Sequence, residues 1–426
     1  MKTKEFSPGD NVEIITKYQK WRGHILESSD SEIILLKLDT GYNIGLRESD
    51  ILDAKTLEKA VWLKKEKSVL STREGLKNIA MIITGGTISS RLDPKTGGTI
   101  PTDAEEILHI APELKDICNI KTIESPFLKF SEDMDPSDWK KIAELAADFL
   151  NQKDIDGIII THGTDTLSYT GTALSFFLKD LNKPVALTYS QRSIDRGSTD
   201  AHLNLVCAAR YATSDIAEVV LVGHETVDDE TCIAIPATKS RKMHASRRDA
   251  FKVINTEPLA RISKDSLEIL KEFNAKDLGK KVKLDAAYND KIALIQVSPG
   301  ADPGILDYYM KEKYKGLVIA TTGLGHVPGK GSKNNWLPKI KKAVDLGMTI
   351  VAAPQAIYGR LNPNVYSSGR DLQKTGIIHL KDMLPETALI KLGWILGHKS
   401  WAKDKEKVKE KLFENVAGEF EERLRT

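Results

Sequence analysis

The sequence is poor in cysteine, in long apolar runs and in charge of one sign, and each shortage excludes a class of protein. The cysteines are few and widely spaced, with no CxxC pair, which argues against a disulfide framework or a zinc site; they are Cys118, Cys207 and Cys232. No stretch approaches the roughly 18 apolar residues of a membrane span, and the first ten residues lack the apolar segment of a signal peptide. We therefore expect a protein of the reducing cytoplasm, without a metal site or a membrane partner.

The charge balance is equally informative. Lys and Arg number 62 and Asp and Glu number 60 in a chain of 426 residues. A dedicated nucleic-acid surface would require a basic excess, so any contact with RNA is expected to be local or supplied by a partner. A hydrophobic content of 41% is that of a globular protein, and the length suggests more than one domain.

The amino-terminal part alternates short β-rich runs with turn residues. Four such runs precede residue 52, and their spacing predicts a small β-barrel: Asn11 to Thr16, Trp21 to Glu27, Glu32 to Leu38 and Tyr42 to Leu46. From Ala54 to Leu76 the pattern becomes helical and then highly charged, which indicates an exposed connector. Residues 1–75 are therefore predicted to form a small β-barrel domain and its connector.

Beyond residue 75, aliphatic strands alternate with amphipathic helices. Buried aliphatic strands interleaved with helices predict an α/β fold with mainly parallel sheets. The predicted strands are Ile79 to Ile83, Gly157 to Thr161, Val185 to Thr188, Val219 to Val222, Ile292 to Val297, Leu317 to Thr321 and Thr349 to Ala352; the predicted helices are Ser137 to Leu150, Leu167 to Lys179, Thr199 to Ala212, Leu337 to Leu346 and Glu386 to Leu396. A charged, weakly periodic stretch, 256–290, is predicted to link two α/β lobes, 76–255 and 291–426.

Two of these strands end in turns that carry hydroxyl groups. The first runs into Thr84-Gly85-Gly86-Thr87, and the second runs into His162-Gly163-Thr164-Asp165. Ligands bind at the carboxyl ends of strands in open α/β sheets, so the two turns could face one substrate. A glycine-rich turn can also simply begin a helix, but the co-occurrence of two favours a catalytic site.

The chemistry of such a site follows from the residue types. A threonine hydroxyl is a weak nucleophile at neutral pH and requires a neighbouring base, commonly a lysine held by a carboxylate and a second hydroxyl. Thr164 and Asp165 supply the second hydroxyl and the carboxylate for Thr87. Glycines allow main-chain N–H groups to approach a substrate oxygen, as an oxyanion hole requires.

The two turns resemble the paired signature motifs of the bacterial-type L-asparaginase and glutaminase family. Ser131-Glu132-Asp133-Met134 is similar to that family's substrate-binding turn, and Met383 to Leu392 is similar to its closing helix. The resemblance covers roughly residues 77 to 400. It implies a two-lobed asparaginase-like core, with Ser131 and Glu132 in the substrate-binding turn.

The resemblance also implies roles for the catalytic residues. Thr87 corresponds to the nucleophile, and the pair Thr164 and Asp165 binds and activates the substrate. Lys239 and Lys242 compete for the role of the family's lysine. Lys242 is chosen because Phe251 follows it by nine residues, as in the family pattern. From composition alone, Lys242 would be a solvated charge in a basic run.

Two other residues bear on the mechanism. The family has a tyrosine in the loop after the first motif, and here Pro94 stands at about that place in a loop without tyrosine. The helper of Thr87 is therefore not identified. His162 is expected to be a satisfied turn residue rather than a general base, because the family's mechanism relies on lysine.

The amino-terminal extension, together with Tyr366 to Leu372, resembles the D subunits of archaeal glutamyl-tRNA(Gln) amidotransferases. This resemblance implies a glutaminase that delivers ammonia to an E subunit, which binds Glu-tRNA(Gln) and amidates it with ATP and Mg. It also implies a homodimer through the asparaginase-like core, and no cofactor in this chain. A free cytosolic L-asparaginase and a non-catalytic scaffold are the rival interpretations.

Overall fold

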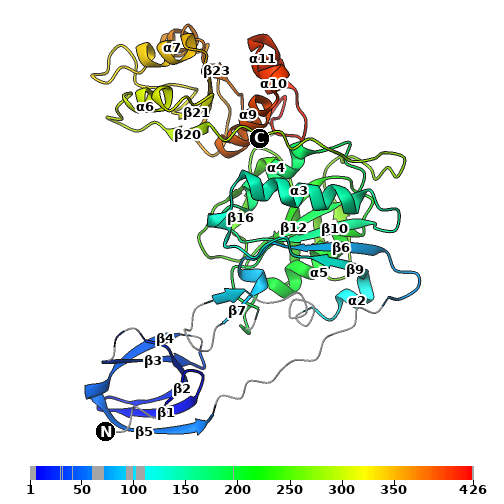
Figure 1. The fold of residues 1–426 in the computed structure, drawn as a ribbon, viewed down its shortest axis with the longest axis vertical. Coiled ribbons are helices and arrows are strands. Elements are labelled where there is room, and N and C mark those ends of the chain that lie inside the picture. Colours follow the sequence, from blue (N-terminus) through cyan, green and yellow to red (C-terminus); the bar gives the residue numbers. More distant parts are fainter. Residues whose placement is uncertain are drawn as a thin grey trace.

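The computed structural model describes residues 6–28, 30, 32–40, 42–59, 72–92, 99–101, 111–194 and 196–424. Figure 1 shows a small amino-terminal sheet domain, a central α/β lobe and a carboxyl-terminal α/β lobe. These bodies confirm the predicted α/β class and the predicted order of a β domain followed by a two-lobed core.

The amino-terminal domain is a five-stranded antiparallel sheet that curls in the manner of a barrel (Figure 1). Its strands lie in the order β4-β3-β2-β1-β5: β1 (Asn11–Thr16), β2 (Lys20–Leu26), β3 (Ile33–Leu38), β4 (Asn43–Arg47) and β5 (Ile51–Glu58). The helical pattern expected from Ala54 is wrong over β5. That segment pairs antiparallel with β1, and Ala54 lies opposite Ile14, a buried core residue. Residues 60–71 of the predicted connector lie outside the described residues.

The central lobe is built on an eight-stranded sheet of order β18-β17-β14-β13-β12-β10-β6-β9. The five strands from β13 to β9 are parallel, and the other three continue the sheet antiparallel. The strands are β6 (Asn78–Ile83), β9 (Asn119–Glu124), β10 (Gly157–Thr161), β12 (Val185–Thr188), β13 (Val219–His224), β14 (Thr231–Pro236), β17 (Ala260–Ser263) and β18 (Leu267–Ile269).

The predicted linker 256–290 is wrong over residues 260–269, because β17 and β18 belong to this sheet. Ala260 and Ile262 are fully buried and face the sheet's core, while Arg261 between them is exposed and bound to Glu225. This alternation is that of an antiparallel strand with one wet face. The remaining domain boundaries stay predictions.

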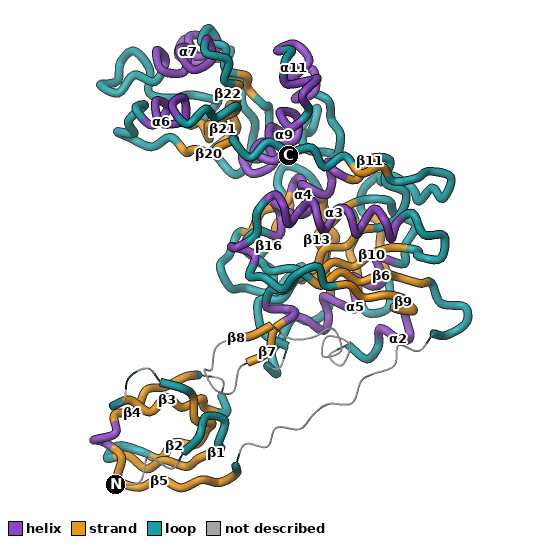
Figure 2. The backbone as a smooth tube through the Cα atoms, viewed as in Figure 1, coloured by secondary structure: helices purple, strands orange, loops and turns teal. Residues whose placement is uncertain are grey.

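Helices cover both faces of the central sheet (Figure 2). Side chains alternate along β6: Ala80 and Ile82 pack in the core under α3 and α4, and Met81 packs in the core under α5. Because a parallel strand between two helical layers is buried on both faces, β6 is apolar throughout. The helices of this lobe are α2 (Leu114–Ile117), α3 (Pro136–Leu150), α4 (Leu167–Phe177) and α5 (Ala201–Ala212).

Short pairs of strands flank the central sheet. They are β7 (Ser90–Leu92) with β8 (Thr99–Pro101), β11 (Leu178–Lys179) with β19 (Lys283–Leu284), and β15 (Ser240–Lys242) with β16 (Phe251–Val253). The last pair carries the predicted catalytic lysine.

The carboxyl-terminal lobe has a four-stranded parallel sheet of order β20-β21-β22-β23. Its elements are β20 (Ile292–Gln296), α6 (Ile305–Lys311), β21 (Gly316–Thr321), α7 (Leu337–Asp345), β22 (Thr349–Pro354), α8 (Ser367–Gln373), β23 (Ile378–His379), α9 (Pro385–Gly397), α10 (Lys399–Ala402) and α11 (Lys405–Phe413). Helix α9 packs on α4, where Phe176 and Trp394 stack with ring centroids 5.6 Å apart. The two lobes therefore share one hydrophobic core.

Candidate active site

The predicted hydroxyl-bearing turns meet at the carboxyl edge of the central sheet. The chain passes from β6 to β9 on one side and returns to β10 on the other, so the switch of direction lies between β6 and β10. Ligands in open α/β sheets bind at such switch points. The turn with Thr87 follows β6, and the turn with Thr164 and Asp165 follows β10.

Glycines allow the two turns to touch. Gly86 has φ 78°, and a Cβ placed on it would lie 2.3 Å from the backbone nitrogen of Gly163. A Cβ on Gly163 would in turn lie 2.8 Å from the Cβ of Ser131. No side chain fits at either position, so these glycines are required for close approach and not only for a bend. The turns after β6 and β10 and the predicted substrate turn thus form one cluster.

Hydroxyl groups fix the turn that presents Thr87. The Thr84 hydroxyl donates to the carbonyl of Thr161 at 2.8 Å, and the Ser90 hydroxyl donates to the carbonyl of Gly86 at 2.6 Å. Thr87 begins the 3₁₀ turn η3 (Thr87–Ser89) and is half-buried, while Ile88 beside it is fully buried. The backbone around the predicted nucleophile is therefore held by the neighbouring strand end.

Lys242, the lysine predicted for catalysis, contacts both Thr164 and Asp165 in the turn after β10. Its Nζ donates to Thr164 Oγ1 at 2.7 Å and to Asp165 Oδ1 at 2.8 Å. The lysine side chain is 16% exposed and the aspartate side chain 61% exposed, so the lysine is mostly buried and the carboxylate faces solvent. A lysine held by a hydroxyl and a carboxylate is the arrangement that activates a threonine nucleophile.

Lys239, the competing candidate, points elsewhere. It lies in the turn η5 (Ala237–Lys239), is 1% exposed, and forms a buried ion pair with Asp382 of the carboxyl-terminal lobe. The geometry therefore separates two lysines that the sequence leaves three residues apart. It brings Lys242 alone to Thr164 and Asp165.

The predicted substrate turn packs against the turn after β10. Ser131 is buried in the 3₁₀ turn η4 (Ser131–Asp133), and its Oγ accepts a hydrogen bond from the backbone N–H of Asp165 at 3.1 Å. Thr166 donates to the Ser131 carbonyl at 2.6 Å. Glu132 is exposed. Ser131 is thus joined to the turn after β10, and the neighbouring Glu132 faces solvent.

His162 is a structural residue of the turn. Its Nδ1 donates to the Gly163 carbonyl at 2.7 Å, and its Nε2 accepts from the Thr170 hydroxyl at 2.8 Å. Complete burial lowers the pKa of His162 to about 4. A neutral imidazole with both nitrogens satisfied is not placed to act as a general base, as the sequence predicted.

The three cysteines are free and buried, so no disulfide forms among them. Burial raises the pKa of the Cys118 thiol to about 12. Pro94 and the rest of its loop lie outside the described residues. Within the described part of the chain, no group of His, Cys, Asp and Glu could hold a metal ion, and no helix is long and apolar enough to span a membrane.

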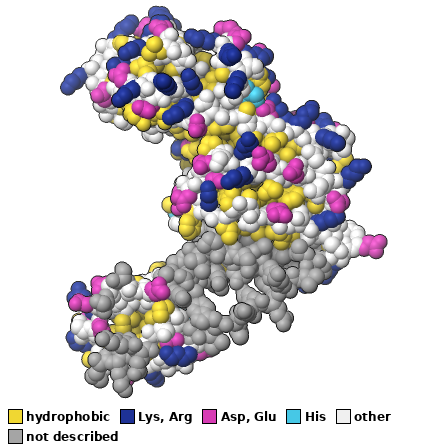
Figure 3. Space-filling model, viewed as in Figure 1, with side chains coloured by type: hydrophobic (Ala, Val, Ile, Leu, Met, Phe, Trp, Pro, Cys, Tyr) yellow, Lys and Arg dark blue, Asp and Glu magenta, His cyan; other side chains and the backbone are white. Residues whose placement is uncertain are grey.

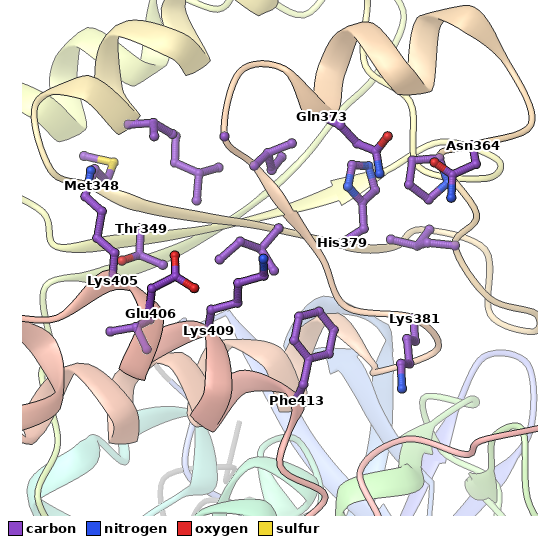
Figure 4. A pocket seen from close by; sticks show the side chains of 18 of the residues that line it. Met348, Thr349, Asn364, Gln373, His379, Lys381, Lys405, Glu406, Lys409 and Phe413 are labelled. Carbon is purple, nitrogen blue, oxygen red and sulfur yellow. The ribbon is translucent and has the colours of Figure 1, made fainter.

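A separate cavity of about 690 Å³ lies in the carboxyl-terminal lobe, between the edge strand β23 and α11. Figure 4 shows Lys405 and Lys409 on one wall and His379 and Gln373 on the other. None of the residues predicted for catalysis lines it. On the face drawn in Figure 3, basic and acidic side chains are interspersed over both lobes, as expected from the balanced composition.

Sequence reasoning missed two acidic residues that bind the segment before Lys242 on the side away from Thr164 and Asp165. Asp382 and Glu386 come from the carboxyl-terminal lobe, and they pair with the cations on either side of Ser240. The partners in each pair are more than 140 residues apart along the chain, so no local pattern joins them. The two acidic residues flank Met383-Leu384-Pro385 at the start of α9, and this proximity is the only local signal that they share.

Comparison with known proteins first defines the class. Residues 78–275 match the family model "Asparaginase, N-terminal" and residues 291–412 match "Glutaminase/Asparaginase C-terminal domain". The solved L-asparaginase of Thermococcus kodakarensis is 28% identical with a TM-score of 0.72, and covers 81% of this chain and 100% of its own. L-asparaginase I of Vibrio cholerae is 29% identical with a TM-score of 0.69, over 82% of this chain and 100% of its own. The core is therefore of the asparaginase and glutaminase class.

The amino-terminal domain narrows this class. Residues 6–57 match the family model "GatD N-terminal domain". The D subunit of the glutamyl-tRNA(Gln) amidotransferase of Thermococcus kodakarensis is 46% identical over 92% of this chain and 88% of its own. The corresponding D subunit of Pyrococcus abyssi is 43% identical over 99% of this chain and 96% of its own. The chain belongs to the family of glutamyl-tRNA(Gln) amidotransferase D subunits.

Proposed function

We propose that this chain is the glutaminase subunit of a tRNA-dependent amidotransferase, with Thr87 as its nucleophile. One observation carries the proposal: Lys242 Nζ is held by Thr164 and Asp165 at 2.7 and 2.8 Å, on a turn whose backbone approaches the turn of Thr87 closely. The family membership supplies the amidotransferase context.

The chemistry is an acyl transfer in two steps. The Thr87 hydroxyl oxygen attacks the side-chain amide carbon of glutamine, and the oxyanion is stabilised by main-chain N–H groups of the glycine-rich turn. Lys242 relays the proton from Thr87 to the leaving nitrogen, the C–N bond breaks and ammonia departs. Water then hydrolyses the glutamyl ester, which releases glutamate and restores the threonine.

Substrate binding falls to the neighbouring turns. Ser131 and Asp165 hold the α-carboxylate and α-amino groups, with Glu132 and Thr164 alongside. The hydrogen bond between Asp165 N–H and Ser131 Oγ supports this assignment, because it fixes the two turns relative to each other. The exposed Asp165 and Glu132 carboxylates would attract an α-amino group.

The product is delivered to a partner. Ammonia passes to an E subunit that holds ATP and Mg, binds Glu-tRNA(Gln), and converts it to Gln-tRNA(Gln) in the cytoplasm. The core forms a homodimer; the exposure of Leu128 and Phe130, at 44% and 45% beside the substrate turn, supports a second chain covering this face.

The experiment is ammonia release from glutamine by the wild-type protein and by Thr87→Ala and Lys242→Ala. Both variants are expected to lose activity by about 10³-fold or more while remaining folded. Thr226→Ala, which removes a hydroxyl from an exposed loop outside the site, is the control and should keep full activity. Full activity in either site variant would refute the assignment. Parallel assays with asparagine establish the preferred amide.

A further inference from the structure

The carboxyl-terminal lobe binds the segment that carries Lys242 on the side away from Thr164 and Asp165. Lys239 Nζ donates to Asp382 Oδ2 at 2.5 Å, and the two side chains are 1% and 0% exposed. Burial lowers the pKa of Lys239, and the Asp382 carboxylate opposes that effect. Because both side chains are buried, neither charge can be solvated by water if the pair separates. The pair therefore fixes the relative position of Lys239 and Asp382.

The end of the chain completes this contact. The backbone N–H of Glu421 donates to both carboxylate oxygens of Asp382 at 3.2 Å. The hydroxyl of Thr238 donates to the carbonyl of Ala417 at 2.8 Å, and the hydroxyl of Thr387 on α9 donates to the carbonyl of Thr238 at 2.8 Å. Residues 416–421, here called the carboxyl-terminal strap, thus bind the turn η5 directly before β15.

A second ion pair holds β15 itself. Arg241 Nη2 lies 3.2 Å from Glu386 Oε1 in the first turn of α9. Successive residues of a strand point to opposite faces. Arg241 therefore faces the carboxyl-terminal lobe, whereas Lys242 faces Thr164 and Asp165.

The strand needs such support because its own pairing is minimal. β15 has three residues, and among the described residues its only strand partner is the equally short β16. A two-stranded ribbon of this length is not stable alone. Contacts outside the ribbon must therefore fix its position, and the two ion pairs with Asp382 and Glu386 supply such contacts on the side away from Thr164.

We propose that the Lys239–Asp382 and Arg241–Glu386 ion pairs, together with the carboxyl-terminal strap, are positioning contacts that hold the Lys242 side chain against Thr164 and Asp165. They touch neither substrate nor the reacting atoms. The inference rests on the proposed function, since Lys242 must be the proton carrier for its position to affect turnover.

The test is the double variant Lys239→Met with Asp382→Asn in the full-length protein. Removing both charges avoids an unpaired buried ion, and asparagine keeps an acceptor for the Glu421 N–H. We expect a folded protein with KM for glutamine within about threefold of wild type, kcat reduced about tenfold or more, and a shifted pH profile of kcat. The matched control is Lys276→Met with Asp156→Asn, an ion pair at the amino ends of the central strands, which should leave kcat and its pH profile unchanged.

Two outcomes overturn the proposal: wild-type kcat in the folded double variant, or an equal loss of kcat in the control. Should the double variant fail to fold, Glu386→Gln, which weakens the more exposed Arg241 pair, must lower kcat with KM retained, and an unchanged kcat there overturns it. Lys242→Ala in the same assay separates the two claims. If Lys242→Ala is active, the proposed function fails; if it is inactive while the Lys239 and Asp382 double variant is fully active, only the positioning role fails.

Discussion

Lys239 and Lys242 show that the residues around a lysine determine its role. Both lie in one basic run, and composition alone would make each a solvated charge. Lys239 is instead buried against Asp382, and Lys242 donates to Thr164 in the turn after β10. The meeting of the turns that carry Thr87 and Thr164 was predictable, because each turn directly follows a strand of the sheet. Lys242 was chosen only from its spacing to Phe251, and the catalytic roles stay predictions. The contacts of Asp382 and Glu386 were not predictable, since their partners come together only when the lobes pack.

His162 predicts a pH dependence of stability. Its pKa in the folded protein is about 4, below its ordinary value of 6.5. At a pH between these two values, His162 is protonated in the unfolded chain and neutral in the folded chain. The contribution of the neutral His162 to the free energy of unfolding is complete above pH 6.5 and is lost as the pH falls toward 4. It amounts to about 3 kcal/mol, from a difference of about 2.5 pKa units at 1.36 kcal/mol each.

The measurement is the free energy of unfolding from pH 7 to 4.5 for wild type and His162→Gln. The variant is expected to be less stable at pH 7 and to lose less stability over this range. Parallel curves for the two proteins would contradict the assignment of a buried neutral imidazole.

Among the elements, strands with a clear aliphatic run or with a clear alternation between turn residues were predictable, and several short strands rich in charged residues were not. The aliphatic runs of β10 and β12 match the predicted strands residue for residue. β5, β17 and β18 were missed because charged residues alternate with apolar ones in short segments, a pattern close to that of a connector. Pairing, more than local propensity, makes them strands: β5 pairs with β1, β17 pairs with β14, and β18 pairs with β17 in a hairpin.

At Gly86, in the turn after β6, we expect the addition of one methyl group to have a large effect on stability and activity. Gly86→Ala is expected to lower the melting temperature and abolish ammonia release, because the new Cβ would lie 2.3 Å from Gly163 at φ 78°. Positive φ alone costs about 1–3 kcal/mol, and the clash adds to it. Gly75→Ala is the matched control: Gly75 has φ 88° but no atom within 4 Å of an added Cβ. Thermal melting should show only the smaller effect there, and equal effects at both positions would exclude the contact between the turns.

At the scale of the whole molecule, the order of the domains was predictable from changes in periodicity along the chain. The packing of the lobes was not. Helix α9 reads as an apolar helix in sequence, and nothing local indicates that its Trp394 stacks on α4 or that its first turn holds β15. The structure thus connects the carboxyl-terminal lobe to the strand that carries Lys242. The family model matched by residues 6–57 connects the amino-terminal domain to the D subunits.

The function proposed for the whole chain is to produce ammonia for the amidation of Glu-tRNA(Gln). It is tested most directly by ammonia release from glutamine by the purified chain, alone and with the E subunit, ATP, Mg and Glu-tRNA(Gln). We predict that the partner and the tRNA together stimulate release, and that Gln-tRNA(Gln) forms with wild type but not with Thr87→Ala. Unstimulated hydrolysis, with asparagine preferred and no Gln-tRNA(Gln) formed by the assembled complex, would contradict this function.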